Sequence, residues 1–150
     1  MKRFEFSLAK LQSYKEQMLE SEKNALGILR RELRDLEREL EENIRLIDMK
    51  SDELEYIMLR GVSSADLASH KRFIMVKQQE GHELRRLIAL KQMEVEKQLE
   101  VVVEVTKEVN TLEKLEERQL EEYTYLANKQ EELFIEEFVS NQRVTAELTG

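Results

Sequence analysis

The sequence contains no cysteine, no proline and no tryptophan, and only four glycines among its 150 residues. The absence of cysteine excludes disulfides and thiolate metal sites, and it fits a reducing compartment. Proline and glycine mark most turns of globular domains, so this chain has few places to reverse direction. These absences predict long helices with few breaks.

Long apolar stretches are also missing. No segment approaches the about 20 apolar residues that a helix needs to cross a bilayer, so we expect no direct membrane insertion. Residues 1–6 include two basic residues but no apolar segment and no cleavage site, so no secretory signal is expected. A net charge of -8 disfavours binding to nucleic acid. We therefore expect a cytoplasmic protein.

The sequence is rich in charge and in apolar residues at helical spacing. Charged residues make up 37% of the chain and hydrophobic residues 41%. Because the apolar residues are spread along the whole chain, they can bury a seam between helices rather than a globular core. We expect an all-α fold in which residues 1–150 form a single coiled-coil domain.

The first helix is predicted at about residues 4–60. Between residues 36 and 47 its apolar positions are spaced by 4, 4 and 3 residues. This 11-residue repeat predicts a nearly straight or slightly right-handed stretch, after which Ser51 takes one seam position. The predicted seam of this helix contains Leu8, Leu11, Met18, Ala25, Leu29, Leu33, Leu36, Leu40, Ile44, Ile47, Leu54 and Met58.

A break is predicted at about residues 61–64. Gly61 suits the position just after a helix, where the backbone adopts a positive φ. Ser63 followed by Asp66 predicts a capping box that opens the second helix, with Ser64 as the alternative cap. Because the link is so short, the two helices must fold back on each other in antiparallel orientation.

The second helix is predicted at about residues 65–142. Its seam positions repeat every seven residues over many turns, which is a heptad pattern. They are Leu67, Ile74, Gly81, Ile88, Val95, Val102 and Val109, with Leu84, Val105, Leu112, Leu126 and Leu133 in the companion positions. His70, Lys77 and Lys91 interrupt the pattern nearer the turn. Glycine costs about 1 kcal/mol relative to alanine inside a helix, so Gly81 predicts a bend or a close approach of the helices.

The predicted helices are unequal in length. At about 1.5 Å per residue, the first spans roughly 80 Å and the second roughly 115 Å. Folding at Gly61 pairs residues whose numbers sum to about 122, which leaves residues from about Gln119 to Gln142 without a partner. An exposed apolar stripe on such an overhang implies a protein partner. We expect residues 143–150 to be frayed. The overhang carries Tyr123, Tyr125, Leu126, Leu133, Phe134, Ile135 and Phe138.

No arrangement of residues predicts catalysis. The sequence has no glycine-rich phosphate loop and no Ser/His/Asp set on defined turns. His70 and His82 are 12 residues apart on one helix, hence about 18 Å apart and too far to share a metal ion. The many paired carboxylates lack a pocket that would raise their pKa, so we interpret them as solvated charge. We therefore expect no enzyme activity, no cofactor and no metal.

Three apolar groups each leave two interpretations open. The run Phe73–Val76 is either a wide seam near the turn or a docking patch for a protein. Phe4 and Phe6 either plug the open end of the hairpin or dock that end into a partner. The aromatic residues of the overhang either bind a partner or, in the alternative interpretation, mediate self-association or bend back on the rod.

Several segments resemble one known family. Phe4-Glu5-Phe6-Ser7-Leu8 is similar to the Phe-x-Phe-x-Leu start of the bacterial flagellar export protein FliJ. Residues 111–142 resemble the C-terminal block of that family, where a Leu-Glu-x-Leu-x-x-Arg core precedes an acidic stretch. Residues 70–74 resemble the aromatic-isoleucine patch early in the second helix of the family. The core here consists of Leu112, Glu113, Leu115 and Arg118, and the acidic stretch closes with Glu136 and Glu137.

The resemblance implies a stalk-like protein of flagellar export, similar to the γ subunit of rotary ATPases. Such proteins insert both ends of their coiled coil into the hexamer of the export ATPase at the cytoplasmic face of the membrane. They also bind the export gate membrane protein and escort substrate chaperones. The resemblance assigns Phe73 and Ile74 to the export gate, with Lys77 where an apolar residue is expected. It places at the ATPase-proximal end Phe4, Phe6, Leu112, Leu115, Arg118, Tyr123, Phe134 and Phe138.

Two alternatives share this layout. Injectisome stalk proteins have the same hairpin, so the resemblance covers them as well. A structural coiled coil that tethers other proteins and self-associates through its overhang is the other candidate.

Overall fold

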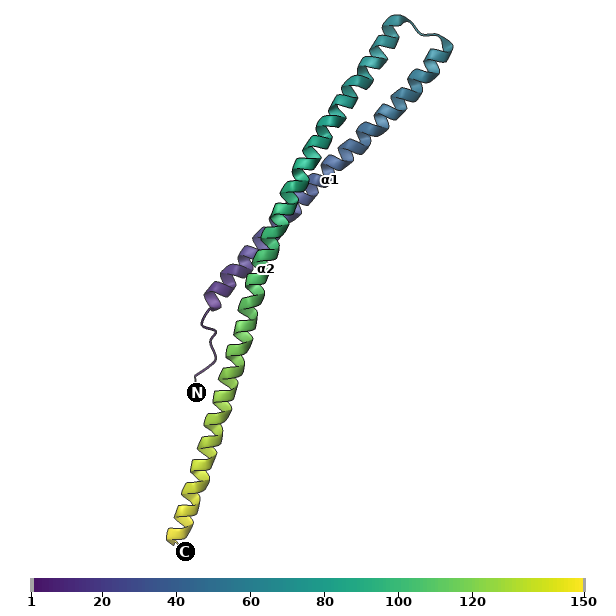
Figure 1. The fold of residues 1–150 in the computed structure, drawn as a ribbon. Helices are drawn as coiled ribbons and strands as arrows, with labels where there is room; N and C mark the ends of the chain where they lie inside the picture. Colours follow the sequence, from purple (N-terminus) through teal and green to yellow (C-terminus); the bar gives the residue numbers. More distant parts are fainter. Residues whose placement is uncertain (1, 150) are drawn as a thin grey trace. The chain divides into compact units, whose positions relative to one another are not determined.

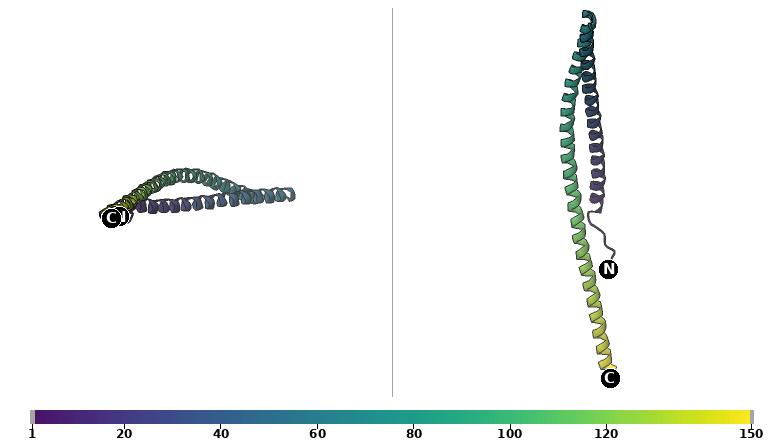
Figure 2. Two further views of the ribbon diagram at one scale, coloured as in Figure 1. Left: turned by 90° about the horizontal axis from the view of Figure 1, so that it is seen from below. Right: turned by 90° about the vertical axis from the view of Figure 1, so that its right-hand side faces the viewer.

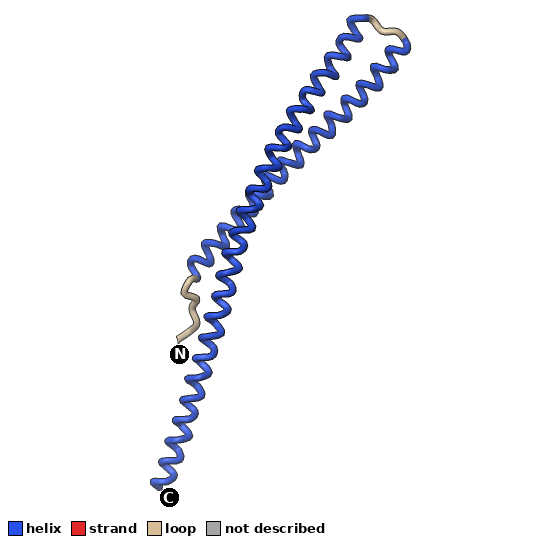
Figure 3. Tube along the Cα trace, viewed as in Figure 1, coloured by secondary structure: helices blue, strands red, loops and turns tan. Residues whose placement is uncertain are grey.

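The computed structural model describes residues 2–149, which form two helices and no strand. Helix α1 spans Ala9–Arg60 and helix α2 spans Ser64–Thr149 (Figure 1). A short loop joins them, and a second loop precedes α1 (Figure 3). The expected all-α hairpin with a longer second helix is confirmed.

The chain divides into two units, which are described separately. The turn unit comprises Glu20–Val103, and the terminal unit comprises the residues up to Leu19 together with those from Glu104 onward. Each unit contains one stretch of α1 and one stretch of α2 (Figure 2). Side chains join the two stretches, as Lys91 and Glu32 do in the turn unit and Lys15 and Glu108 in the terminal unit.

The turn follows the prediction closely. Gly61 has a φ of 93°, the left-handed conformation that glycine adopts at low cost after a helix. The Ser63 hydroxyl accepts a hydrogen bond of 3.2 Å from the Asp66 amide, and the Ser63 carbonyl accepts one of 3.0 Å from Leu67. Ser63, and not the alternative Ser64, therefore caps α2.

Two helix boundaries differ from the expected ones. Helix α1 begins at Ala9 rather than near residue 4, because the preceding segment gains more by burying Phe6 than by adding one terminal helical turn. Helix α2 continues to Thr149 rather than ending near residue 142. No proline or glycine lies between Gly81 and Thr149, so nothing in the sequence stops the helix.

In the turn unit, α1 presents a different residue to the seam than expected. Asn43 is buried with 6% exposure, whereas Ile44 is exposed. The 11-residue repeat is therefore wrong here, and Ser51 is exposed instead of occupying the seam. The less exposed positions follow an unbroken heptad: Leu36, Leu40, Asn43, Ile47, Lys50, Leu54 and Ile57.

Gly81 explains why a polar residue occupies this position. The side-chain amide of Asn43 donates a hydrogen bond of 2.9 Å to the Lys77 carbonyl. A Cβ atom added to Gly81 would lie 2.7 Å from Oδ1 of Asn43, closer than atoms in contact can stand. Gly81 thus leaves the space that Asn43 fills, and the predicted close approach of the helices is confirmed.

Few apolar side chains of the described residues are buried. The turn unit buries Leu26, Ile88 and Val102, and the terminal unit buries Phe6, Val105, Val109 and Leu112. This distribution is that of a seam between two helices, as expected.

Polar pairs flank the seam on both sides. In the turn unit, Lys91 binds Glu32 at 2.7 Å. In the terminal unit, Lys15 binds Glu108 at 2.5 Å. The numbers of each pair sum to 123, which agrees with the predicted antiparallel register. Hydrogen bonds to these carboxylates raise the pKa of both lysines above the ordinary value of 10.5.

The contact between Asn43 and Gly81 yields a test by double-mutant cycle. Gly81→Ala should add about 1 kcal/mol of helix stability but should displace Asn43, which costs about the same. Gly81→Ala should therefore leave the free energy of unfolding of the wild-type protein unchanged. In the Asn43→Ala variant, the same substitution should raise the free energy of unfolding by about 1 kcal/mol. Urea unfolding followed by circular dichroism measures both values.

Gly27 supplies the matched control for this cycle. A Cβ at Gly27 meets no atom within 4 Å, so Gly27→Ala should be equally stabilising with or without Asn43. An equal gain from Gly81→Ala in both backgrounds would show that Asn43 and Gly81 are not coupled.

Alkaline pH tests the ion pair of Lys15. Because its pKa is raised in the folded protein, its contribution to stability is complete below 10.5 and is lost as pH rises through the folded pKa. Lys15→Met should therefore show a smaller fall in Tm than wild type between about pH 9 and about pH 11.5. Lys129→Met, at an exposed position without an ion pair in residues 2–149, is the control and should keep the wild-type fall.

Candidate protein-interaction surfaces

The segment before α1 lies against α2 in the terminal unit. The ring of Phe4 contacts that of Tyr123, with 5.5 Å between the ring centroids. The Tyr123 hydroxyl donates a hydrogen bond to the Lys2 carbonyl, and the amide of Gln119 donates one of 3.1 Å to the Ser7 hydroxyl. Gln119 and Tyr123 therefore have partners within the chain, contrary to the expected start of the overhang.

The physical reason is the extension of this segment. An extended chain advances about 3.3 Å per residue and a helix only about 1.5 Å, so residues 2–8 reach further along α2 than a helix would. The overhang consequently begins later, and every described residue beyond Ala127 is exposed.

The residues assigned to the ATPase-proximal end differ in burial. Phe6 and Leu112 are each only 8% exposed and belong to the core of the terminal unit. Leu115 and Phe4 are half-buried, whereas Arg118 is exposed. Phe6 thus plugs the seam, and of the two interpretations offered for it, burial is the one that the structure supports.

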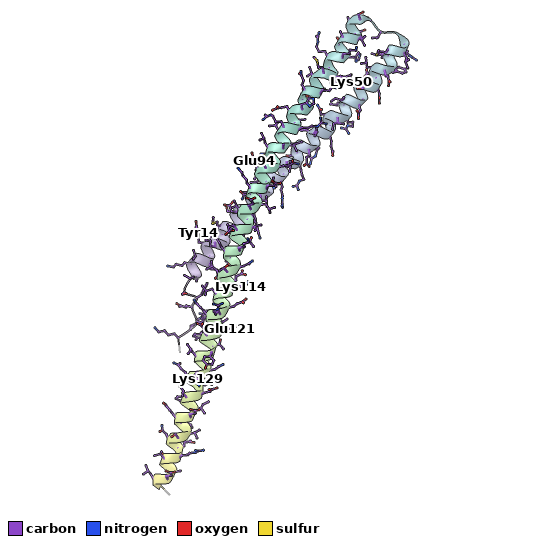
Figure 4. All side chains as sticks on the ribbon, in the orientation of Figure 1. Tyr14, Lys50, Glu94, Lys114, Glu121 and Lys129 are labelled. Carbon is purple, nitrogen blue, oxygen red and sulfur yellow. The ribbon has the colours of Figure 1, made fainter. Side chains whose placement is uncertain are left out.

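The overhang presents a wide apolar stripe. Phe134 is 69% exposed, Phe138 is 55% exposed and Leu133 is 50% exposed. At about 100° per residue, the stripe runs along one side of α2 through Leu126, Leu133, Phe134, Phe138, Val144 and Leu148. Figure 4, which labels Lys129 on this stretch, shows the side chains projecting from α2 beyond the N-terminal segment.

Acidic side chains accompany this stripe. Residues 113–137 contain nine acidic and three basic residues. A helix with one apolar stripe and many carboxylates on its remaining surface can dock into an apolar site that carries positive charge.

The second candidate surface lies in the turn unit. Phe73 is part-exposed on α2, and its ring is approached by Lys50 from α1 at 5.3 Å and by Lys77 from α2 at 5.7 Å. Both ammonium groups lie within the range of a cation–π interaction. Ile74 is half-buried in the seam, whereas Met75 and Val76 are exposed. The run Phe73–Val76 therefore has one residue in the seam and three outside it.

Lys77 contributes to the structure near the turn through its carbonyl and its charge. Its ammonium group binds Glu80 at 3.1 Å besides approaching Phe73, while its carbonyl accepts the hydrogen bond from Asn43. Figure 4 labels Lys50, which approaches the same ring from the other helix. A lysine thus fits the place where the sequence led us to expect an apolar residue.

Sequence reasoning missed Asn43 and Lys50 as seam residues. Both lie in heptad register with Leu36 and Leu40, and that register was the available signal. A single polar residue at such a position commonly specifies the register of a coiled coil. No sequence pattern predicts the contact of Phe4 with Tyr123, because this contact depends on the extended conformation of the segment before α1.

No group of three or more potential ligands within residues 2–149 could hold a metal ion. Among the same residues, neither helix has a stretch long and apolar enough to cross a membrane.

Comparison with known proteins places this hairpin in a family. The family model described as the flagellar FliJ protein matches residues 4–146, which include nearly all of both helices. The chain belongs to the FliJ family. Its function is therefore related to flagellar protein export, in which FliJ proteins are components of the export apparatus rather than enzymes. No curated protein and no solved structure matches the chain at a significant level.

In this FliJ protein, Phe6 belongs to the core and Phe134 to the surface, so substitutions of the two should affect stability differently. Phe6→Ala should lower the free energy of unfolding by about 3 kcal/mol, because it empties a buried site. Phe134→Ala should change it by no more than about 0.5 kcal/mol, because that ring contacts solvent. Urea unfolding of both variants under one condition tests this, and equal losses would contradict the assignment of Phe6 to the core and Phe134 to the surface.

Proposed function

We propose that this FliJ protein acts as a stalk in flagellar protein export, at the cytoplasmic face of the membrane. Its terminal unit docks into the central hole of the export ATPase hexamer. The surface around Phe73 and Ile74 binds the export gate membrane protein, and the hairpin also escorts substrate chaperones. The observation that carries this proposal is the apolar stripe that α2 exposes beyond Ala127.

Burial supports a division of labour within the terminal unit. Phe6 and Leu112 stabilise the pairing of the helices, so they act on the ATPase only by holding α2 in place. Phe134 and Phe138 face solvent and can be buried by a partner at no cost to the hairpin. Arg118 and the exposed carboxylates of residues 113–137 supply charge around the contact.

The gate contact uses chemistry different from that of the stripe. Lys50 and Lys77 flank Phe73, and residues 71–91 carry six positive and two negative charges. Such a surface favours an acidic partner with an apolar pocket for the ring. Export in an injectisome is the alternative setting for the same stalk, and the ATPase that binds most tightly distinguishes the two.

A point-variant experiment tests the role of the stripe. Phe134→Ser combined with Phe138→Ser should weaken binding to the export ATPase hexamer by about tenfold or more and remove stimulation of ATP hydrolysis. Ile135→Ser combined with Val139→Ser changes apolar residues that are also exposed, at 54% and 41%, about 100° further round the helix, and is the matched control. Circular dichroism should report unchanged helicity for both pairs.

Truncation gives a second measure of the same contact. A chain that ends at Ala127 keeps the contact of Tyr123 with Phe4 but lacks the stripe beyond Leu126, whereas a chain that ends at Glu121 loses both the contact and the whole stripe. Both should fail to stimulate the ATPase. Normal stimulation by the chain ending at Ala127 would overturn the stalk proposal. Analytical ultracentrifugation tests the tethering alternative. That alternative requires the full chain to form a dimer and the chain that combines Phe134→Ser with Phe138→Ser to be a monomer.

A further inference from the structure

Helix α1 carries two overlapping heptads near the turn, and they share every seventh residue from Leu40 to Leu54. The observed seam adds the residue three positions after each shared one, and a second seam would add the residue four positions after. The observed seam adds Asn43, Lys50 and Ile57, which are the less exposed set. The second seam would add Ile44, Ser51 and Met58.

A rotation of α1 by about 50° exchanges one set for the other. Successive helical residues diverge by about 100°, and Asn43 and Ile44 lie on either side of the shared row. The two seams coincide up to Leu40 and separate after it, so only residues 41–60 take part. Such a change of phase unwinds a coiled coil locally and keeps the backbone hydrogen bonds within each helix.

The observed seam buries a polar atom that is not satisfied. Asn43 is 6% exposed, and its Oδ1 atom has no hydrogen-bond partner among residues 2–149. A buried acceptor without a donor opposes the arrangement that buries it. Lys50 also takes a position in this seam, from which its ammonium group binds Glu53 at 3.2 Å. Two of the three residues that distinguish the observed seam are therefore polar.

Apolar side chains and space are both present for the second seam. Ile44 is 41% exposed and Met58 is 52% exposed, so each has surface left to bury. A groove of about 390 Å³ lies between the helices here, and its lining includes Ile44, Asn43 and, from α2, Gly81. The rotation moves Ile44 across this groove towards α2 and carries Asn43 towards solvent, where water can satisfy its amide.

The contacts that distinguish the two seams oppose each other. The hydrogen bond of 2.9 Å from Asn43 to the Lys77 carbonyl and the burial of Ile57 favour the observed seam. Burial of Ile44 and Met58 and release of the unsatisfied oxygen favour the second. Packed helices change between discrete arrangements rather than by continuous deformation, so these opposing terms define two alternative states.

We propose that residues 41–60 of α1 switch between these two seams, with Asn43 buried in one and Ile44 in the other. Gly81 admits both because it has no side chain. In the second state Lys50 moves from the seam to its border, which changes its position relative to the Phe73 ring, now 5.3 Å away. The switch thereby regulates the surface proposed to bind the export gate. That consequence rests on the proposed function, whereas the two seams do not.

Pairs of introduced cysteines report the seam directly, because the chain contains no cysteine of its own. In the register set by Asn43 and Gly81, one heptad step places Lys50 opposite Ile74. The pair Lys50→Cys with Ile74→Cys therefore reports the observed seam, and Ser51→Cys with Ile74→Cys reports the second. The yield of each disulfide in the full chain under mild oxidation measures how often the two positions meet.

Variants at the contact between the helices should shift the ratio of these yields. A Cβ at Gly81 would lie 2.7 Å from Oδ1 of Asn43, so Gly81→Ala should raise the yield of the pair at 51 relative to that at 50 by about fivefold. Asn43→Asp removes the donor to Lys77 and should act in the same direction. Asn43→Leu, which completes the observed seam with an apolar residue, should lower the ratio.

Two controls make the result specific. Asp52→Cys with Ile74→Cys measures random opening of the hairpin, because position 52 points away from α2 in both states. Gly27→Ala is the matched control for Gly81→Ala, since its Cβ meets no atom within 4 Å, and it should leave the ratio unchanged. Gly81→Ala favours helix formation, so its result stands even where Asn43→Asp unfolds the hairpin.

Two outcomes would overturn the switch. One is a ratio that stays the same in Gly81→Ala as in wild type. The other is a yield for the pair at 51 that never exceeds the yield for the pair at 52. No partner is present in this experiment, so a failure of the hairpin to bind the ATPase or the gate leaves these yields unaffected. The switch and the stalk function therefore fail independently.

Discussion

The hairpin depends on a seam whose register is specified by one polar contact, between Asn43 of α1 and the space above Gly81 of α2. Apolar side chains alone tolerate small shifts between two helices, since one leucine can replace another at similar cost. The amide of Asn43 must reach a carbonyl, and its side chain fits only where no Cβ stands. Asn43 and Gly81 therefore determine which residues of α1 face α2 in the turn unit.

The two units build their seams from different residues. Val105, Val109 and Leu112 are buried in the terminal unit, where burial of apolar surface is the main stabilising contribution. In the turn unit, Lys50, Lys77 and Lys91 occupy seam positions and extend their charged ends to solvent, carboxylates or an aromatic ring. A seam of this kind specifies register at the expense of stability, and it leaves Phe73 accessible at its edge.

A helix pair can bury only one side of each helix, so any further apolar stripe remains available to partners. The FliJ protein exposes such stripes at the overhang and on the outer face of α1, and a smaller apolar group beside Phe73. The charges around them differ: many carboxylates at the overhang, lysines beside Phe73, and Asp52, Glu55 and Arg60 near Leu59. Differences in charge allow one simple fold to discriminate between partners.

The sequence by itself determined the helices, the turn and the family. The signals that determined them are local, and each acts on the backbone near it. They are the scarcity of proline and glycine, the heptad of α2, and the turn residues Gly61 and Ser63. Local signals could not decide whether Asn43 or Ile44 faces the seam, because both choices give a helical repeat and only the hole at Gly81 selects between them. They also could not predict the extended segment before α1, which is stabilised by the burial of Phe6 and by the contact of Phe4 with Tyr123 of α2. These features required the tertiary structure, since they depend on contacts between residues about 40 to about 120 positions apart in the sequence.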